Sequence, residues 1–166
     1  MKTLLKNGTL VTASDTIRAD ILLDGETIAL IGQNLPGDAD AVVDISGQYI
    51  LPGAIDVHTH LELPMMGTCS SDDFYTAKIF GMYPCKGTIA VGSDADIAIW
   101  DPALKKTMAV ATSHQRTDYN LYEGMEVTGW PDKVYSRGRL LVDGDLWHGK
   151  PGTGKYIHRS AHAPVI

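Results

Sequence analysis

The sequence has little cysteine, no long hydrophobic run and no secretory signal. Its two cysteines, Cys69 and Cys85, lack a C-x-x-C spacing, which favours reduced thiols over a disulfide framework or a cysteine zinc site. No stretch approaches the roughly 18 apolar residues of a membrane helix. The N-terminal run has only a short apolar pair between lysines, too little for the apolar core of a signal peptide. These absences predict a cytoplasmic protein with no membrane partner.

The charge balance argues against a nucleic-acid partner. The chain has 14 Lys and Arg against 20 Asp and Glu, a formal net charge of -6, and no long block of either sign. Nucleic-acid binding normally needs a basic patch or tail, so it is not expected here. A length of 166 residues suits one domain or one and a fraction.

Short runs in which apolar and polar residues alternate, separated by glycine turns, predict a mainly β fold. In the first third we expect a strand, a turn at Asn7-Gly8 and a second strand. A type I′ hairpin is expected at Asp24-Gly25, because this pair suits two successive positive φ angles. Two further short strands are expected at residues 41–44 and 48–51.

The second half of the sequence predicts another group of strands. We expect them at residues 87–89, 96–101 (ended by Pro102), 108–110, and 134–138 with 139–142 around a turn. Neither 1–51 nor 86–145 has enough strands alone, so we expect one composite β-sandwich formed jointly by both segments. Residues 146–166 predict an extended tail that is ordered only if it docks on something.

Residues 52–85 differ from both β segments. Apolar residues from Phe74 to Phe80 fall loosely on one helical face, and Ser71 or Asp72 could cap the start, which predicts a helix over 72–82. Before this helix, Pro52-Gly53 precedes a strand-like run. Residues 52–85 are therefore expected to form a unit of one strand and one helix.

The strand-like run contains the candidate metal ligands His58 and His60. Side chains two apart on a strand face the same side, about 6.5–7 Å apart at Cα, so both imidazoles could reach one ion. Two hydrogen-bonded imidazoles at a strand end are the plainer alternative. Asp56 extends the pattern to G-x-I-D-x-H-x-H, which favours a metal site. A catalytic zinc usually takes three protein ligands, so this pair is at most half of one.

Several stretches together resemble the hydantoinases and dihydropyrimidinases of the amidohydrolase superfamily. They are Asn7-Gly8-Thr9 with the Asp24-Gly25 hairpin, L-P-G-A-I-D-V-H-T-H at 51–60, A-K-I-F-G at 77–81, K-G-T-I-A-V-G-S-D-A-D at 86–96 and Y-N-L-Y-E-G at 119–124. The resemblance implies a (β/α)₈ barrel with two metal ions, zinc, bridged by a carboxylated lysine and a hydroxide. It also implies hydrolysis of cyclic amides or imides such as hydantoins and dihydropyrimidines, and assembly into a homo-oligomer.

The resemblance assigns roles to a few residues. It implies that His58 and His60 bind the more buried ion, and that residues 61–72 form the loop that gates the exocyclic group of the substrate. The expected apolar contacts of that loop are Leu63, Met65 and Met66. Nothing in the sequence matches the bridging lysine, the two later histidine ligands or the catalytic aspartate, so no catalytic residue is assigned.

The spacing of the motifs leaves no room for such a barrel. A (β/α)₈ barrel takes about 250 residues, whereas some two dozen residues separate His60 from Lys86. We therefore expect a barrel remnant at 52–85, at most weak zinc binding, and no activity from this chain alone. The alternative is a non-catalytic β-sandwich module that serves stability or oligomer assembly.

Overall fold

A computed structural model describes residues 1–12, 14–53, 64–65, 68–69, 81–114, 118–158 and 161, and for 64–65 and 68–69 it describes the backbone alone. The expected strand at 54–60 lies outside these residues. So does the expected helix, apart from its last two positions, 81 and 82. Among the described residues, no helix is long and apolar enough to cross a membrane.

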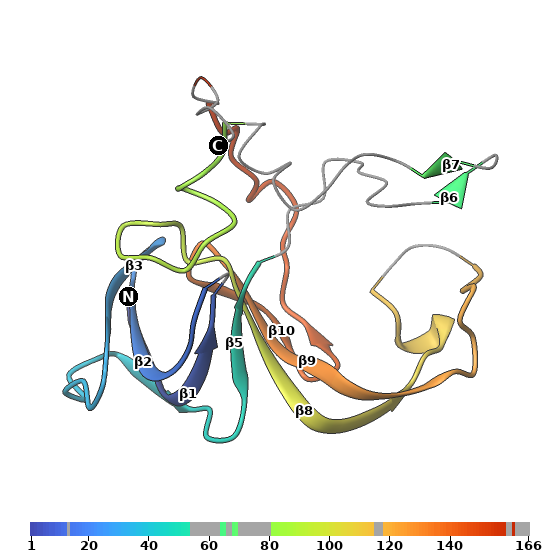
Figure 1. Ribbon diagram of the computed structural model, residues 1–166, viewed down its shortest axis with the longest axis horizontal. Coiled ribbons are helices and arrows are strands. Elements are labelled where there is room, and N and C mark those ends of the chain that lie inside the picture. Colours follow the sequence, from blue (N-terminus) through green and yellow to red (C-terminus); the bar gives the residue numbers. More distant parts are fainter. Residues whose placement is uncertain are drawn as a thin grey trace.

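One mixed sheet of nine strands dominates the described residues (Figure 1). Its strands run in the order β11-β10-β9-β8-β5-β1-β2-β3, and β4 pairs with β1. Their bounds are β1 Lys2–Val11, β2 Thr16–Asp24, β3 Thr27–Gly32, β4 Ala41–Asp44, β5 Tyr49–Pro52, β8 Ile97–Thr107, β9 Glu126–Ser136, β10 Arg139–Asp143 and β11 Leu146–Trp147. The strands β6 (Pro64–Met65) and β7 (Thr68–Cys69) pair separately, and η1 (Val110–Thr112) is a 3₁₀ turn. The mainly β prediction is confirmed.

The N-terminal and C-terminal segments join where β5 meets β8. β5 runs parallel to β1 and antiparallel to β8, with Ile50 directly opposite Ile99. Both of these isoleucines are fully buried. The sheet is therefore continuous between two segments that are far apart in the sequence.

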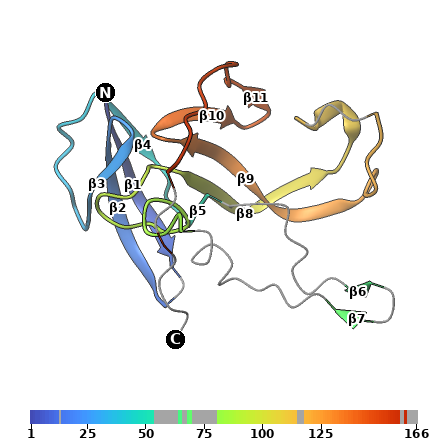
Figure 2. The same cartoon turned by 90° about the horizontal axis from the view of Figure 1, so that it is seen from above.

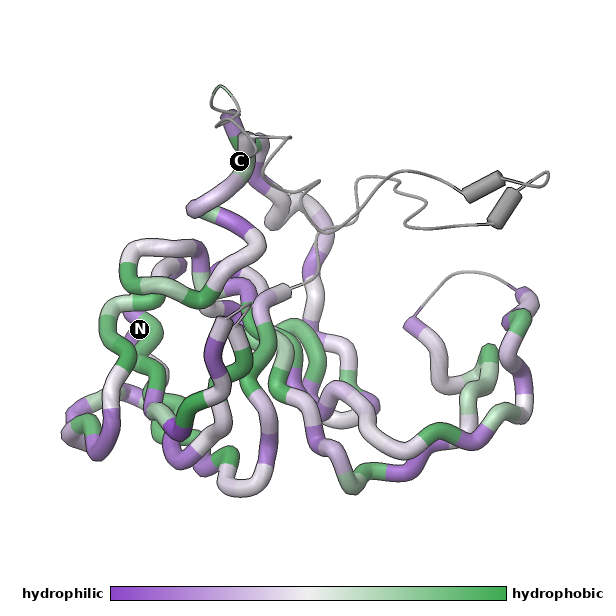
Figure 3. Tube along the Cα trace, in the orientation of Figure 1, coloured by the Kyte–Doolittle hydropathy of each residue, from purple (hydrophilic) through white to green (hydrophobic). Residues whose placement is uncertain are grey.

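The hydrophobic core lies inside this sheet, which curls on itself (Figure 2). The backbone N–H of Ala95 donates to the carbonyl of Glu26 in the β2–β3 loop (2.8 Å), and Gly138 in the β9–β10 turn donates to Ala95 (3.0 Å). Hydrophobic stretches lie along β1, β2 and β3 as well as where β5 meets β8 (Figure 3). The largest fully buried side chains come from both segments: Leu4, Leu5, Ile21, Leu23, Ile28, Ile45, Ile50, Ile97 and Ile99.

The conformation of each hairpin turn depends on a glycine with a positive φ angle. The β2–β3 hairpin forms as expected, but its loop residues are Gly25 and Glu26, and only Gly25 has a positive φ (59°), so the turn is not type I′. In the β9–β10 turn both central residues, Arg137 (46°) and Gly138 (69°), have positive φ, the condition for a type I′ turn.

Two expected chain breaks are irregularities inside continuous strands. β1 runs through Asn7-Gly8, where the register with β2 shifts and Asn7 has a φ of 65°. β8 runs through Pro102, which lies in the register shift between Asp101 and Lys105. A bulge takes residues out of the hydrogen-bonded ladder, so it accommodates a positive φ or a missing N–H without ending the strand. The predictions of a turn at Asn7-Gly8 and a strand end at Pro102 are therefore wrong.

Two expected short strands are not strands. Residues 87–89 lie in a loop outside the named strands, and from there the side chain of Ile89 is buried against the core. β8 ends at Thr107, and residues 108–110 lead into η1. There, the N–H of Val110 donates to the Glu123 carboxylate (2.8 Å), and the N–H of Gly124 donates to Met108 (2.8 Å). These contacts to a facing loop replace strand pairing.

The C-terminal segment begins as β11, which pairs antiparallel with β10, and residues after it dock on the sheet through side-chain contacts. The Arg137 guanidinium donates to the carbonyl of Thr153, and the Lys155 ammonium lies 2.7 Å from both carboxylate oxygens of Glu26. Residues 148–158 therefore dock on the sheet, which is the condition under which an ordered tail was expected.

Candidate functional site

The predicted metal ligands His58 and His60 lie outside the described residues, as do Leu63 and Met66, and the side chain of Met65 is not described. Within the part of the chain that is described, no group of three or more His, Cys, Asp or Glu side chains could hold a metal ion. The described residues do show how the chain leaves the sheet before this segment and how it returns afterwards.

The chain leaves the sheet at Gly53, directly after β5. The N–H of Gly53 donates to the carbonyl of Asp96 (2.9 Å). A Cβ at Gly53 would lie 3.1 Å from the Cβ of Asp96 and 3.4 Å from its carbonyl carbon and oxygen. The absence of a side chain therefore lets the exit from β5 pack directly against the residue that precedes β8.

The chain returns through a loop held by Lys86. The ammonium nitrogen of Lys86 lies 2.8 Å from a carboxylate oxygen of Asp94 and also contacts Asp96, while the lysine side chain is only 12% exposed. Burial acts to lower the pKa of Lys86, but the hydrogen bonds to Asp94 and Asp96 outweigh it and raise the pKa above its usual value. Lys86 is therefore held as a cation.

Asp96 connects this loop to the opposite hairpin. Its second carboxylate oxygen accepts hydrogen bonds from the N–H of Arg137 (2.7 Å) and the hydroxyl of Ser136 (3.2 Å). One carboxylate thus contacts the returning loop and the β9–β10 turn, while the backbone of the same residue binds Gly53. We call Gly53, Lys86, Asp94 and Asp96 the junction cluster.

The charges of the junction cluster serve position rather than reaction. The ammonium of Lys86 pairs with two carboxylates, and both oxygens of Asp96 are engaged. A protonated lysine has no lone pair with which to act as a base or nucleophile, and a neighbouring cation lowers the basicity of a carboxylate. The cluster fixes the two ends of the histidine-bearing segment beside each other.

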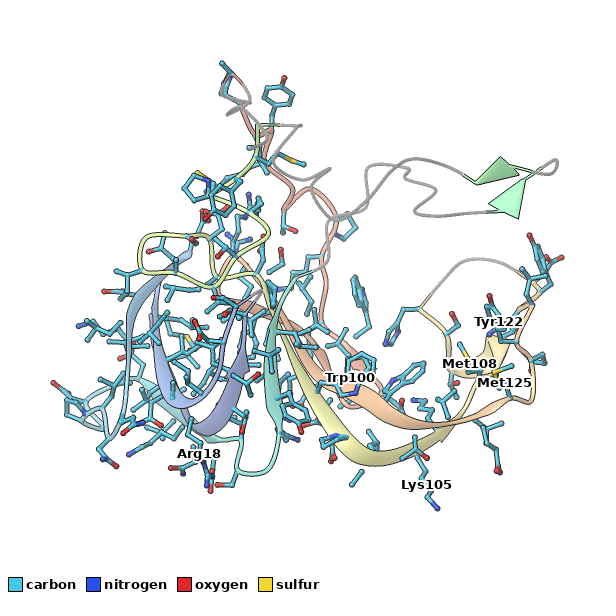
Figure 4. The ribbon with its side chains drawn as sticks, in the orientation of Figure 1. Arg18, Trp100, Lys105, Met108, Tyr122 and Met125 are labelled. Atoms are coloured by element: carbon cyan, nitrogen blue, oxygen red, sulfur yellow. The ribbon has the colours of Figure 1, made fainter. Side chains whose placement is uncertain are left out.

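A cavity of about 680 Å³ lies elsewhere in the described part of the chain. It borders the outer parts of β8 and β9 with the loop between them, residues 102–130, which we call the β8–β9 arm; Met108, Tyr122 and Met125 mark its tip in Figure 4. Its lining includes Tyr119, Trp130 and His114 but no residue of the junction cluster. The junction cluster and this cavity are therefore separate features.

Comparisons with known proteins link this chain to one group of enzymes. A model of the amidohydrolase family matches residues 74–141. The D-hydantoinase of Geobacillus stearothermophilus is 46% identical over 90 residues, which cover 54% of this chain and 19% of the relative. The dihydropyrimidinase of Rattus norvegicus is 47% identical over 90 residues, 54% of this chain and 17% of the relative.

The chain is similar in sequence to hydantoinases and dihydropyrimidinases, and part of it matches the amidohydrolase family. The resemblance stated from residues 51–60, 86–96 and 119–124 is thereby confirmed. The crystal structure of dihydropyrimidinase from Brevibacillus agri NCHU1002 has the same fold, with a TM-score of 0.84 and 19% identity over 99% of this chain and 100% of that chain. By sequence, however, the chain spans about a fifth of the length of the curated relatives it matches.

Amidohydrolases generally use a divalent metal ion. The described residues of this chain do not fit such a centre, because they bring no three ligand side chains together. Only His58 and His60 are assigned as ligands from the sequence, and an open catalytic zinc site usually takes three protein ligands.

The pairing of Lys86 with Asp96 was not predicted from the sequence, where both residues appear only as part of the family motif at 86–96. The spacing of Asp94 and Asp96 is a signal that could have revealed it. In an extended chain, residues two apart face the same side, so two carboxylates in D-x-D can share one cation. The missing information was which lysine the fold brings to them.

Proposed function

We propose that this chain derives from a cyclic-amide hydrolase of the hydantoinase or dihydropyrimidinase type, and that it does not open such rings by itself. The supporting observation is that Gly53 and Asp96 lie in direct contact, with only residues 54–95 between them. A (β/α)₈ barrel takes about 250 residues and rarely fewer than 200. The excursion from the sheet is therefore too short for a complete catalytic barrel.

The proposed metal site is a partial one. His58 and His60 would hold one zinc ion weakly, since a catalytic zinc usually takes three protein ligands. In a complete site such an ion lowers the pKa of a bound water and polarises a carbonyl. Leu63, Met65 and Met66 are proposed as apolar contacts of a cyclic amide or imide ring.

The same proposal divides the chain into three parts. Residues 1–51 and 86–145 form the composite β unit, 52–85 are the remnant of the barrel, and 146–166 form the tail. The pairing of β5 with β8 supports the composite unit. We also propose a cytoplasmic location, which suits the free, exposed thiol of Cys85.

A combined metal and turnover assay tests the proposal. The purified chain, whose mass of 17.9 kDa is first verified, is loaded with zinc and assayed with hydantoin and dihydrouracil. We expect no ring opening above the uncatalysed rate and at most one weakly bound zinc per chain. His60→Ala should abolish zinc retention, and His148→Ala, an exposed histidine outside the segment, should leave it unchanged. Turnover at family-like rates with two zinc ions per chain would overturn the proposal.

A second candidate function is a non-catalytic module for homo-oligomer assembly. It is favoured by exposed apolar side chains near the tip of the β8–β9 arm, where Leu121 is 83% exposed and Tyr122 54% exposed. Clustered exposed apolar residues mark protein contact sites. Analytical ultracentrifugation should show an oligomer that Leu121→Ser dissociates and that Leu146→Ser, on β11, does not. A wild-type monomer at high concentration would contradict this function.

A further inference from the structure

A small cavity of about 210 Å³ lies between the β9–β10 turn and residues 153–157 of the C-terminal segment. In Figure 1 this segment, in red, rises past the returning loop, in green. The charged residues that line the cavity are all basic: Lys86, Arg137, Arg139 and Lys155. Four cations around so small a space are notable in a chain whose formal net charge is -6.

The carboxylates that pair with these cations do not line the cavity. Glu26 binds Lys155 at 2.7 Å and lies 3.6 Å from Arg139, while Asp94 and Asp96 bind Lys86. None of the three acids is among the lining residues. The ion pairs therefore hold three of the four cations in place, while only basic groups line the cavity itself.

Two of the cations have donors to spare. A guanidinium carries five N–H donors and an ammonium three. The side chains of Arg139 and Lys155 are 52% and 59% exposed, so a solute can reach both. Arg137, in contrast, donates to the carbonyl of Thr153 and is thereby fixed in the wall.

We propose that this cavity binds a small multivalent oxyanion of the phosphate type. The planar fork of arginine matches the oxygens of a phosphate group, and charge-assisted hydrogen bonds of this kind are among the strongest in proteins. The volume lies below the roughly 300–1,000 Å³ of typical organic ligand sites, which suits a phosphate or a pyrophosphate. Four cations favour a multivalent anion over a single carboxylate. The site uses neither His58 nor His60 and is independent of ring hydrolysis.

Isothermal titration of the full chain with pyrophosphate, inorganic phosphate, sulfate and acetate, at constant low ionic strength, tests the proposal. Pyrophosphate should bind saturably at one site and most tightly, and acetate should not bind. Arg139→Gln and Lys155→Gln should each weaken pyrophosphate binding about tenfold, the size expected of one charge-assisted hydrogen bond. The matched controls Arg18→Gln and Lys105→Gln, whose parent residues are labelled in Figure 4, remove the same charge away from the cavity and should change affinity less than about twofold.

Two further variants separate binding from folding. Glu26→Gln removes the carboxylate that competes for Lys155 and Arg139, so it should tighten pyrophosphate binding about threefold. Arg139→Lys keeps the charge but loses the fork, so it should bind with intermediate affinity. Thermal unfolding without anion identifies any variant that fails to fold. Absence of saturable pyrophosphate binding, equal losses in the control variants, or weaker binding by a folded Glu26→Gln would each overturn the proposal.

Discussion

The body of the sheet and the β8–β9 arm use the same two strands but bury very different amounts of side chain. In the body, Ile97 and Ile99 of β8 are fully buried and Tyr135 of β9 is 5% exposed. Among the described residues of the arm, only Gly129 is buried. Pairing between β8 and β9 nevertheless continues out to Thr107 and Glu126. Backbone hydrogen bonds can extend a ribbon without a core, but apolar burial supplies most of the stability.

Local contacts maintain the arm where burial does not. The Lys106 ammonium contacts the carboxylate of Asp145 and lies 5.6 Å from the centroid of the Trp130 ring. Exposed ion pairs and cation–π contacts of this kind are each worth at most about 1 kcal/mol. We therefore expect the arm to open at a lower free energy than the body.

Removing core volume should give the largest effect. Ile99→Ala deletes a fully buried side chain that faces Ile50 across the two segments, and it should lower the free energy of unfolding by about 2–5 kcal/mol. Leu121→Ala in the arm, where the side chain is exposed, should change it by less than about 0.5 kcal/mol. Urea unfolding measures both. Equal losses would show that body and arm share one core.

Breaking the junction cluster should come second. Asp96→Asn removes one of the two carboxylates that hold the buried ammonium of Lys86, and we expect a loss of about 1–3 kcal/mol in the free energy of unfolding. Asp101→Asn, whose carboxylate accepts one exposed N–H bond at the base of the arm, is the matched control and should cost less than about 1 kcal/mol. If the Asp96→Asn protein were as stable as the wild type, the junction cluster would not stabilise the fold.

The sequence predicted those parts of the fold that local chemistry decides. The β2–β3 hairpin and the β9–β10 turn were predictable because glycine at a positive φ lies between alternating runs. The turn predicted at Asn7 and the strand end predicted at Pro102 were wrong, because a bulge in a paired strand tolerates both residues. The position of a bulge depends on the partner strand. The strand predicted at residues 87–89 was wrong because Ile89 is a buried residue of a loop. An alternating pattern does not distinguish such a loop from a strand.

The site was less predictable than the fold. The H-x-H pair and the family motifs could be recognised by their spacing. The contacts of Asp96 could not be recognised in this way. Its partners Gly53, Lys86 and Arg137 are not neighbours in the sequence, and Gly53 is 43 positions away. The pairing of β5 with β8 brings Gly53 to Asp96, and the pairing of β8 with β9 brings Arg137 to it.

A glycine substitution tests the contact at the exit from β5. Gly53→Ala places a Cβ 3.1 Å from the Cβ of Asp96, so a neighbour must shift, and we expect a loss of about 1 kcal/mol in the free energy of unfolding. Gly37→Ala, in a loop with nothing within 4 Å of the added Cβ, should be neutral or stabilise by about 0.5 kcal/mol. Thermal and urea unfolding of the pair measure the difference. A Gly53→Ala protein as stable as Gly37→Ala would contradict the close packing at Asp96.

Alkaline pH should give the smallest effect. Hydrogen bonds to carboxylates raise the pKa of Lys86 and of Lys133 against the effect of burial, and burial raises the pKa of Tyr135. For each group the stabilising contribution is present below its ordinary pKa, about 10 for tyrosine and lysine, and is lost as the pH rises through the raised value. The free energy of unfolding should therefore fall above about pH 10.

Substitution separates the share of Lys86 in this alkaline loss. Lys86→Gln should make the free energy of unfolding fall less steeply with pH. Lys105→Gln, an exposed lysine of the arm, should leave the slope unchanged. Urea unfolding between pH 8 and 11 measures the slopes. A fall of the same steepness in Lys86→Gln would mean that this lysine does not contribute.

Native-state amide hydrogen exchange tests most directly whether the two ends of the chain form one body that is distinct from the arm. The amides of β1, β5 and the Ile97–Trp100 part of β8 should exchange with one common, high opening free energy, and the paired amides of the arm should exchange at a clearly lower one. Different opening free energies for β1 and β8 in the body, or an arm as protected as the body, would contradict it.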